Sequence, residues 1–194
     1  MARWIRWIAS GLAVLLLSAC HRPSFRAREL DPARPVPRLV LSDQHGRPFN
    51  LAEQRGRVVL VFFGYTRCPD VCPLTLGMFR DVAKILGTDA ARVRFVFITL
   101  DPEVDTPAFL DRYLRLFSPE FVGLTGPPHL LAATYRFFGA AFQKVPVRNS
   151  AAGYLIAHST NVPVIDREGR WRLNVSHEAT AADVAHDVRQ LLRH

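Results

Sequence analysis

Hydrophobic and polar positions alternate along this chain in blocks that are typical of strands and helices. A continuous apolar run with β-branched residues at positions 58–63 predicts a central strand that is buried on both faces. Residues 93–100 predict a second buried strand of the same kind. Between the two runs, apolar side chains recur at helical spacing over residues 72–86, and Gly87 ends this predicted helix. The order strand, helix, strand indicates an α/β fold.

The rest of the chain continues this alternation. We expect further helices over residues 106–117, 130–138 and 180–192, and further strands over residues 121–124, 142–145, 154–156, 161–165 and 171–175. Polar turns at residues 148–150 and 166–169 predict two hairpins among the later strands, and residues 39–51 predict an N-terminal hairpin. The expected domain covers residues 39–194 and has a central mixed sheet flanked by helices. Ligands of such sheets bind at the carboxyl ends of the central strands.

The beginning of the chain has a different character. Arg3 and Arg6 precede an uncharged run over residues 7–20, which is short for a membrane-spanning helix and typical of a secretory signal. The run ends in Leu-Ser-Ala-Cys20, which resembles the bacterial lipobox, in which the signal is cleaved before a cysteine that carries a lipid. An uncleaved anchor with an incidental cysteine is the alternative. Both interpretations place the domain outside the cytoplasm.

Three segments follow from the lipobox interpretation. We expect residues 1–19 to be a lipoprotein signal peptide, Cys20 to be the site of lipid attachment, and residues 20–38 to be a tether rich in Pro and Arg. The protein would then be lipid-anchored to a cell membrane and would face the periplasm or the cell exterior.

Composition and charge exclude some classes of protein but do not identify a binding partner. The chain has 194 residues, of which 49% are hydrophobic and 22% charged, which excludes a mainly disordered chain and a multi-span membrane protein. Its formal charge is +8, from 25 basic and 17 acidic residues. The basic residues are scattered among acidic ones, and export conflicts with nucleic-acid binding, so we expect no nucleic-acid partner. Three cysteines are too few for a disulfide scaffold, and each needs its own explanation.

Two of these cysteines, Cys68 and Cys72, follow the first central strand at the start of the predicted helix. Residues four apart on a helix have Cβ atoms about 5–6 Å apart, so two sulfurs there can close a disulfide or bind one metal ion. A helix N-terminus also favours the thiolate, which binds metals and exchanges disulfides. A disulfide across so short a loop stabilises a fold only weakly. The pair therefore indicates a metal site, a redox couple or both.

Three other polar residues each allow more than one role at this point. His158 precedes the strand predicted at 161–165, and it would approach the cysteines only if that strand lies beside residues 58–63. Asp101 and Asp105 follow the second central strand, where carboxylates can bind a hard metal ion. Asp-Pro and Asp-Thr-Pro are also turn and cap sequences, and we favour that structural interpretation.

Several blocks together resemble the Sco/SenC family of copper-binding, thioredoxin-like proteins. Gly64–Pro73 resembles the metal-binding turn of the family, and Thr99–Pro107 resembles its strand-end motif. Phe121–Gly126 is similar to its next block, and His158–Ser159 to its His-Ser pair. The blocks occur in order over residues 39–193.

The resemblance implies a thioredoxin-like fold with Cys68, Cys72 and His158 as copper ligands. It also implies delivery of copper to the binuclear site of cytochrome c oxidase subunit II, or to another exported copper protein. Thiolates with an imidazole suit Cu(I), the expected state, with Cu(II) as the alternative. A second hypothesis is a thiol–disulfide oxidoreductase, an enzyme in which Cys68 and Cys72 form a catalytic couple and a disulfide. We expect a monomer.

The sequence departs from the family pattern at two positions. Ala157 stands where the family usually has an acidic residue, and the loss of that carboxylate predicts a missing hydrogen bond to the imidazole of His158. Pro163 interrupts the following strand and predicts a sheet edge or a bulge there.

Overall fold

The apolar runs of the sequence form the middle of a mixed eight-stranded sheet. The structure is a computed structural model that describes residues 24–147 and 153–193, and the predicted signal peptide and Cys20 lie outside these residues. The described strands are β1 (Arg28–Pro35), β2 (Val40–Asp43), β3 (Pro48–Asn50), β4 (Val58–Gly64), β5 (Val93–Thr99), β6 (Val122–Thr125), β7 (Phe142–Pro146), β8 (Tyr154–His158), β9 (Val162–Ile165) and β10 (Arg170–Val175). The helices are α2 (Val71–Leu86), α3 (Pro107–Arg115), α4 (Pro128–Phe138) and α5 (Ala181–Arg193), with 3-10 turns at Leu51–Glu53 and Gly87–Arg92.

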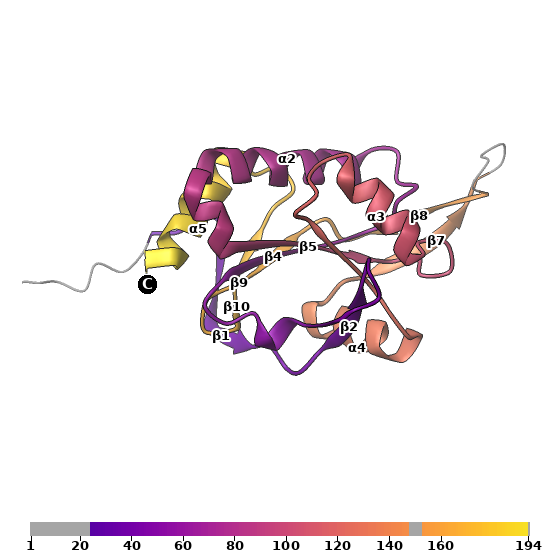
Figure 1. Cartoon of the computed structure of the whole chain (residues 1–194), viewed down its shortest axis with the longest axis horizontal. Helices are drawn as coiled ribbons and strands as arrows, with labels where there is room; N and C mark the ends of the chain where they lie inside the picture. Colours follow the sequence, from indigo (N-terminus) through magenta and orange to yellow (C-terminus); the bar gives the residue numbers. More distant parts are fainter. Residues whose placement is uncertain (1–23, 148–152, 194) are drawn as a thin grey trace, which may run out of the picture.

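The sheet order is β1-β10-β9-β4-β5-β6-β2-β3, in which β4, β5 and β6 are parallel and the other pairs antiparallel. Helices α2, α3 and α5 cover one face of this sheet and α4 covers the other (Figure 1). The α/β fold with a central mixed sheet, the N-terminal hairpin of β2 and β3, and the two later hairpins are confirmed.

Strand β4 lies in the middle of the sheet, and all seven of its residues are buried. Phe62 packs on the α2 side, with its ring centroid 6.0 Å from that of Phe97. Phe63 points to the opposite face, where its ring lies 6.0 Å from that of Tyr135 and 5.8 Å from that of Phe138 in α4. A strand that is apolar at every position must be covered on both faces, which is the arrangement predicted from its sequence.

The tether predicted over residues 20–38 is wrong in its second half. Residues Arg28–Pro35 form β1, an edge strand that pairs with β10, so the ordered domain begins before Leu39. The side chains of β1 are mostly exposed, and backbone hydrogen bonds to β10 hold the strand in place. The sequence carries no hydrophobic period here because few side chains of this strand enter the core.

Pro163 lies in β9 between two neighbouring strands, so the predicted sheet edge is wrong. It pairs with Asn174 of β10, whereas β4 pairs only with Val164 and Ile165. The paired part of β4 thus ends before the proline. A register shift lies close by, between Trp171 and Leu173 of β10, in agreement with the predicted irregularity.

The β7–β8 hairpin is a separate two-stranded sheet that projects from one end of the domain (Figure 1). The described chain begins beside α5, at the other end of the molecule. Among the residues that the structure describes, no helix is both long and apolar enough to cross a bilayer.

Candidate metal centre

The loop of residues 65–70, which we call the Cys loop, connects β4 to α2 at the carboxyl end of the central strands. The helix begins at Val71, one residue before its predicted start at Cys72, and Cys68 lies in the loop that precedes it. Cys68 Sγ still lies over the start of α2, where the backbone N–H of Cys72 donates to it at 3.5 Å. Cys72 is fully buried and Cys68 only partly so.

His158, at the end of β8, approaches the cysteines from the β7–β8 hairpin. Its Nε2 lies 3.8 Å from Cys72 Sγ. The imidazole stands edge-on to two aromatic rings, with its centroid 6.1 Å from that of Phe62 and 6.2 Å from that of Tyr65. This packing fixes the plane of the imidazole and directs Nε2 toward the sulfurs.

The other imidazole nitrogen fixes the tautomer. His158 Nδ1 lies 2.9 Å from the carbonyl oxygen of Ser159, and because a carbonyl only accepts, Nδ1 carries the proton. Nε2 of the neutral ring then presents its lone pair to a metal ion. The predicted loss of a hydrogen bond through Ala157 is therefore wrong, since the backbone supplies the partner. In a strand, side chains at positions 157 and 158 also point to opposite faces.

The three ligand atoms lie within 4.8 Å of one another, and no other group of three His, Cys, Asp or Glu residues in the described part of the chain meets this condition. Ligands about 2.0–2.3 Å from one ion in a trigonal plane are separated by about 4 Å. Small side-chain rotations would therefore let Cys68, Cys72 and His158 share an ion. Two sulfurs and one imidazole favour a soft metal such as Cu(I).

The pKa values of the two thiols are shifted in opposite directions. The Cys72 thiol donates to Cys68, and this hydrogen bond, together with the backbone N–H groups of Asp70 and Cys72, holds the pKa of Cys68 well below its usual range despite burial. The same hydrogen bond and complete burial raise the pKa of Cys72. The predicted effect of the helix N-terminus thus applies to Cys68, and the pair is poised as one thiolate and one thiol. Neither cysteine is in a disulfide in this structure.

This asymmetry predicts selective alkylation of the reduced protein. At about pH 6, where an ordinary thiol is protonated, we expect iodoacetamide to modify Cys68 at least about tenfold faster than Cys72. Peptide mapping of each cysteine at successive times measures the two rates. The same reaction in denaturant is the control and should remove the difference. Equal rates in the folded protein would contradict the assignment of the thiolate to Cys68.

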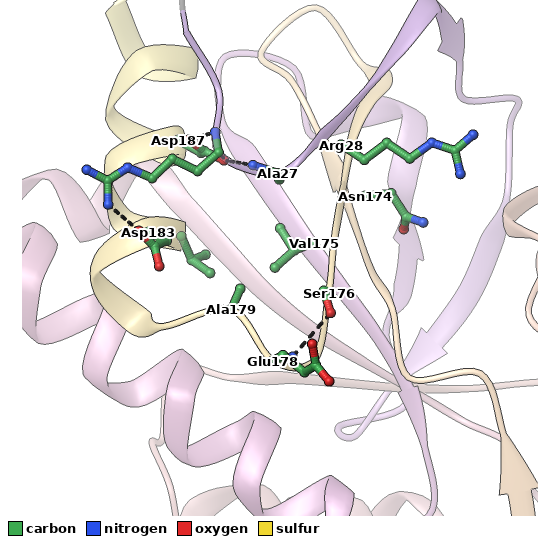
Figure 2. Close-up of a pocket in the computed structure, with 11 residues that line it drawn as sticks. Ala27, Arg28, Asn174, Val175, Ser176, Glu178, Ala179, Asp183 and Asp187 are labelled. Atoms are coloured by element: carbon green, nitrogen blue, oxygen red, sulfur yellow. Dashed lines mark hydrogen bonds and ion pairs between the residues drawn. The ribbon is translucent and has the colours of Figure 1, made fainter.

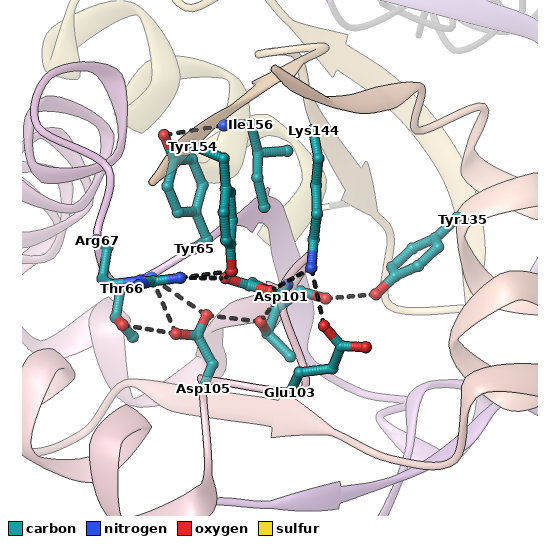
Figure 3. Close-up of polar contacts among 11 residues, drawn as sticks. Tyr65, Thr66, Arg67, Asp101, Glu103, Asp105, Tyr135, Lys144, Tyr154 and Ile156 are labelled. Carbon is teal, nitrogen blue, oxygen red and sulfur yellow. Dashed lines mark hydrogen bonds and ion pairs between the residues drawn. The ribbon is translucent and has the colours of Figure 1, made fainter. Parts of the chain in front are cut away.

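Asp101 and Asp105 do not belong to the metal group, and the structural interpretation is confirmed. Asp105 accepts hydrogen bonds from the backbone and hydroxyl of Thr66 and from the Thr99 hydroxyl, while burial raises its pKa. Asp101 has no exposed surface, and burial alone would raise its pKa. Hydrogen bonds from Tyr154 and two cationic side chains outweigh burial and lower the pKa of Asp101 (Figure 3).

A groove of about 520 Å³ lies beside the metal group. It is lined by the Cys loop on one side and by β7 and β8 on the other, and it contains Cys68 and His158. The exposed apolar side chains of Val145 and Leu155 line the same groove. The metal group is therefore open to a second molecule.

A second cavity, of about 430 Å³, lies between the N-terminal segment, β10 and α5 (Figure 2). Its buried carboxylate, Asp187, accepts the backbone N–H groups of Arg26 at 2.9 Å and Ala27 at 2.7 Å. This carboxylate holds the start of the described chain on α5. The cavity contains no member of the metal group, so we assign the metal chemistry to the other groove.

Sequence reasoning found the three residues of the metal group but missed what supports them. The Ser159 carbonyl has no signature in the sequence because every residue has one. Tyr65 stands next to the cysteine motif, yet its hydroxyl accepts the backbone N–H of Ile156 at 3.2 Å, a contact between segments far apart in the chain.

A Cys-Cys-His group at the carboxyl end of the central strands defines a class of α/β proteins with an open site for a soft metal. Comparisons with known proteins identify the member of this class. The sequence model of the SCO1/SenC family matches residues 28–193. A SCO2-like protein of Rickettsia prowazekii is 35% identical over 144 residues, which cover 74% of this chain and 70% of the relative.

Solved structures agree with the sequence comparison. ScoI of Bradyrhizobium japonicum with copper bound is 35% identical, with a TM-score of 0.72 over 81% of this chain and 98% of the other. Apo Sco1 of Thermus thermophilus is 34% identical, with a TM-score of 0.74 over 88% of this chain and 97% of the other. The chain belongs to the SCO1/SenC family, and its fold is thioredoxin-like.

Proposed function

We propose that this protein is an exported, membrane-tethered copper metallochaperone that binds copper through Cys68, Cys72 and His158. The observation that carries the proposal is the convergence of two sulfurs and one imidazole within 4.8 Å beside an open groove. ScoI, a similar protein, has been solved with copper bound. Two soft thiolates and an imidazole suit Cu(I), and Cu(II) is the alternative state.

Copper binding needs little rearrangement of protons at this site. The pKa of Cys68 is lowered and that of Cys72 is raised, so Cys72 is the thiol that has to release its proton when copper binds. His158 Nδ1 faces the Ser159 carbonyl, which leaves Nε2 to face the metal ion. A three-coordinate ion leaves room for a ligand of the receiving protein to bind before a ligand of this chain departs. An open site of this kind suits delivery, whereas structural metal sites are closed.

The receiving protein that we propose is subunit II of cytochrome c oxidase, as the family resemblance implies, or another exported copper protein. Lipid attachment at Cys20 would tether the domain to a membrane. The described chain begins at the end of the molecule opposite the β7–β8 hairpin, so the metal group would face away from that membrane (Figure 1).

One observation favours a second function, thiol–disulfide exchange. A partly exposed thiolate at Cys68 beside a buried thiol at Cys72 is the arrangement of a nucleophile and a resolving cysteine. Cys68 would attack a disulfide of the target, and Cys72 would then displace the target thiol. The target disulfide is thereby reduced, and a Cys68–Cys72 disulfide forms. His158 distinguishes the two functions, because only the copper site requires it as a ligand.

Copper titration of the reduced protein tests the three-ligand site. We expect one copper ion per chain and a loss of affinity in His158→Ala. Loss of a partner outside the ligand shell already costs about 10–100-fold in affinity, so removal of a ligand should cost at least as much. His45→Ala, which alters an exposed histidine in the β2–β3 turn, is the matched control. Unchanged affinity in His158→Ala would refute the three-ligand site and leave thiol exchange as the better proposal.

A further inference from the structure

The hairpin that carries His158 has little packing of its own. All five residues of β7 are exposed, and Ile156 is the one fully buried residue of β8. A two-stranded hairpin by itself is at best marginally stable in water. The place of His158 relative to the cysteines therefore depends on the few contacts that join this hairpin to the Cys loop.

These contacts lie on one face of β8. Tyr154, Ile156 and His158 alternate along the strand and so share that face. The N–H of Ile156 donates to Tyr65 Oη, and His158 reaches Cys72. Tyr154, at the other end of the strand, meets the Cys loop through its ring, which lies 4.8 Å from the guanidinium carbon of Arg67.

A single buried carboxylate joins the segments at Tyr154 (Figure 3). Asp101, which follows β5, accepts from the hydroxyl of Tyr154 at 2.6 Å and from the guanidinium of Arg67 at 3.1 Å. The ammonium of Lys144 in β7 pairs with the second oxygen of Asp101 at 3.1 Å. Arg67 also donates to the Tyr154 hydroxyl. The Cys loop, the end of β5 and both strands of the hairpin thus meet at one carboxylate.

The charges of this cluster are balanced. Lys144 pairs with Glu103 at 2.9 Å as well as with Asp101, so two cations face two carboxylates. The ring of Tyr154 lies against both cations, 4.7 Å from Lys144 Nζ. A buried carboxylate with several charged donors has a well-defined geometry, because the loss of any donor leaves charge uncompensated.

We propose that Asp101, Arg67, Tyr154 and Lys144 form a latch that holds the hairpin on the Cys loop and thereby positions His158 for copper. The inference rests on the proposed copper site and adds positioning residues to it. None of the four supplies a ligand atom to the metal group. The latch preorganises the third ligand, so a broken latch should leave a site of two cysteines with a mobile imidazole.

Tyr154→Phe is the sharpest test, because it keeps the ring between the two cations and removes only the hydroxyl. We expect its copper affinity to fall by about 10–100-fold, as for other residues that orient a metal ligand. In the metal-free protein, we expect the amide of Ile156, which donates to Tyr65 Oη, to exchange hydrogen about tenfold faster, while those of β4 and β5 keep their rates. Arg115→Gln, which breaks the exposed Asp111–Arg115 pair on α3, is the control and should change neither quantity.

A double-mutant cycle shows whether the effect on affinity passes through His158. In a His158→Ala background, Tyr154→Phe should cause no further loss of copper affinity. An equal loss in both backgrounds would overturn the latch, as would unchanged copper affinity and hydrogen exchange in Tyr154→Phe. If Tyr154→Phe does not fold, Lys144→Met carries the same test.

Failure of the latch and failure of the copper proposal give different results. If the wild-type protein does not bind copper, the proposed function fails, and hydrogen exchange of the metal-free hairpin still tests whether the latch holds β8. If the wild-type protein binds copper and Tyr154→Phe behaves identically, the copper site stands and the latch is wrong.

Discussion

Replacement of Cys68 by serine should weaken copper binding until the dissociation constant lies in the micromolar range or above. Comparable thiolate sites for zinc bind with free energies on the order of 10 kcal/mol, so the loss of one of three ligands should weaken binding by about a hundredfold or more. A serine hydroxyl is a hard donor that stays protonated near neutral pH, so it does not replace a soft thiolate. Cys68 is partly exposed, so the substitution should leave the fold intact.

The measurement is a titration of the reduced Cys68→Ser protein with Cu(I) against a competing chelator, with thermal unfolding recorded on the same sample. Cys72→Ser should bind as weakly. The hydroxyl of that variant would also lie in a fully buried position, so we expect a lower unfolding temperature as well. The His45→Ala protein again serves as control. Copper affinity equal to that of the wild type in Cys68→Ser would contradict the site.

Gly64→Ala should destabilise the protein, although the change adds a single methyl group. A Cβ at Gly64 would lie 2.8 Å from Cys72 Sγ, 2.9 Å from Phe97 Cε2 and 3.0 Å from Phe62 Cε1. All three neighbours are almost completely buried, so they cannot rotate into solvent. Overpacking of this kind costs about 1–3 kcal/mol of unfolding free energy. The displaced sulfur of Cys72 should also weaken copper binding.

Gly77→Ala is the matched control, and this change should raise the free energy of unfolding instead of lowering it. Gly77 lies inside α2, and a Cβ there would meet no atom within 4 Å. Alanine in a helix interior is more favourable than glycine by about 0.5–1 kcal/mol. Urea denaturation of the two variants and the wild type gives the comparison. A Gly64→Ala protein as stable as the wild type would show that the end of β4 or its neighbours can move, in conflict with the close packing around Gly64.

The core and the motif of this protein could be predicted because each depends on local sequence. Strand β4 is apolar at successive positions, and such a run has to be covered on both faces wherever it lies. The helix predicted from residue 106 likewise has a local start, because the Thr106 hydroxyl accepts the N–H of Phe109 and caps α3. In these elements the residues that form the structure are neighbours in sequence.

Other features were missed because they depend on the backbone or on distant partners. Strand β1 is held mainly by main-chain hydrogen bonds to β10, which leave no side-chain pattern. The hydrogen bond between His158 Nδ1 and the Ser159 carbonyl likewise concerns a group that every residue carries.

The sequence by itself determined the fold class, the reactive cysteine pair at a strand end and, through family resemblance, the third residue of the metal group. Only the tertiary structure decided that His158 reaches Cys72, which of the two thiols keeps its proton, and how Asp101 joins the hairpin to the Cys loop. The reason is physical. Local apolar patterns dictate which segments are buried. The pKa of a thiol and the orientation of an imidazole depend instead on groups that folding brings together from distant parts of the chain.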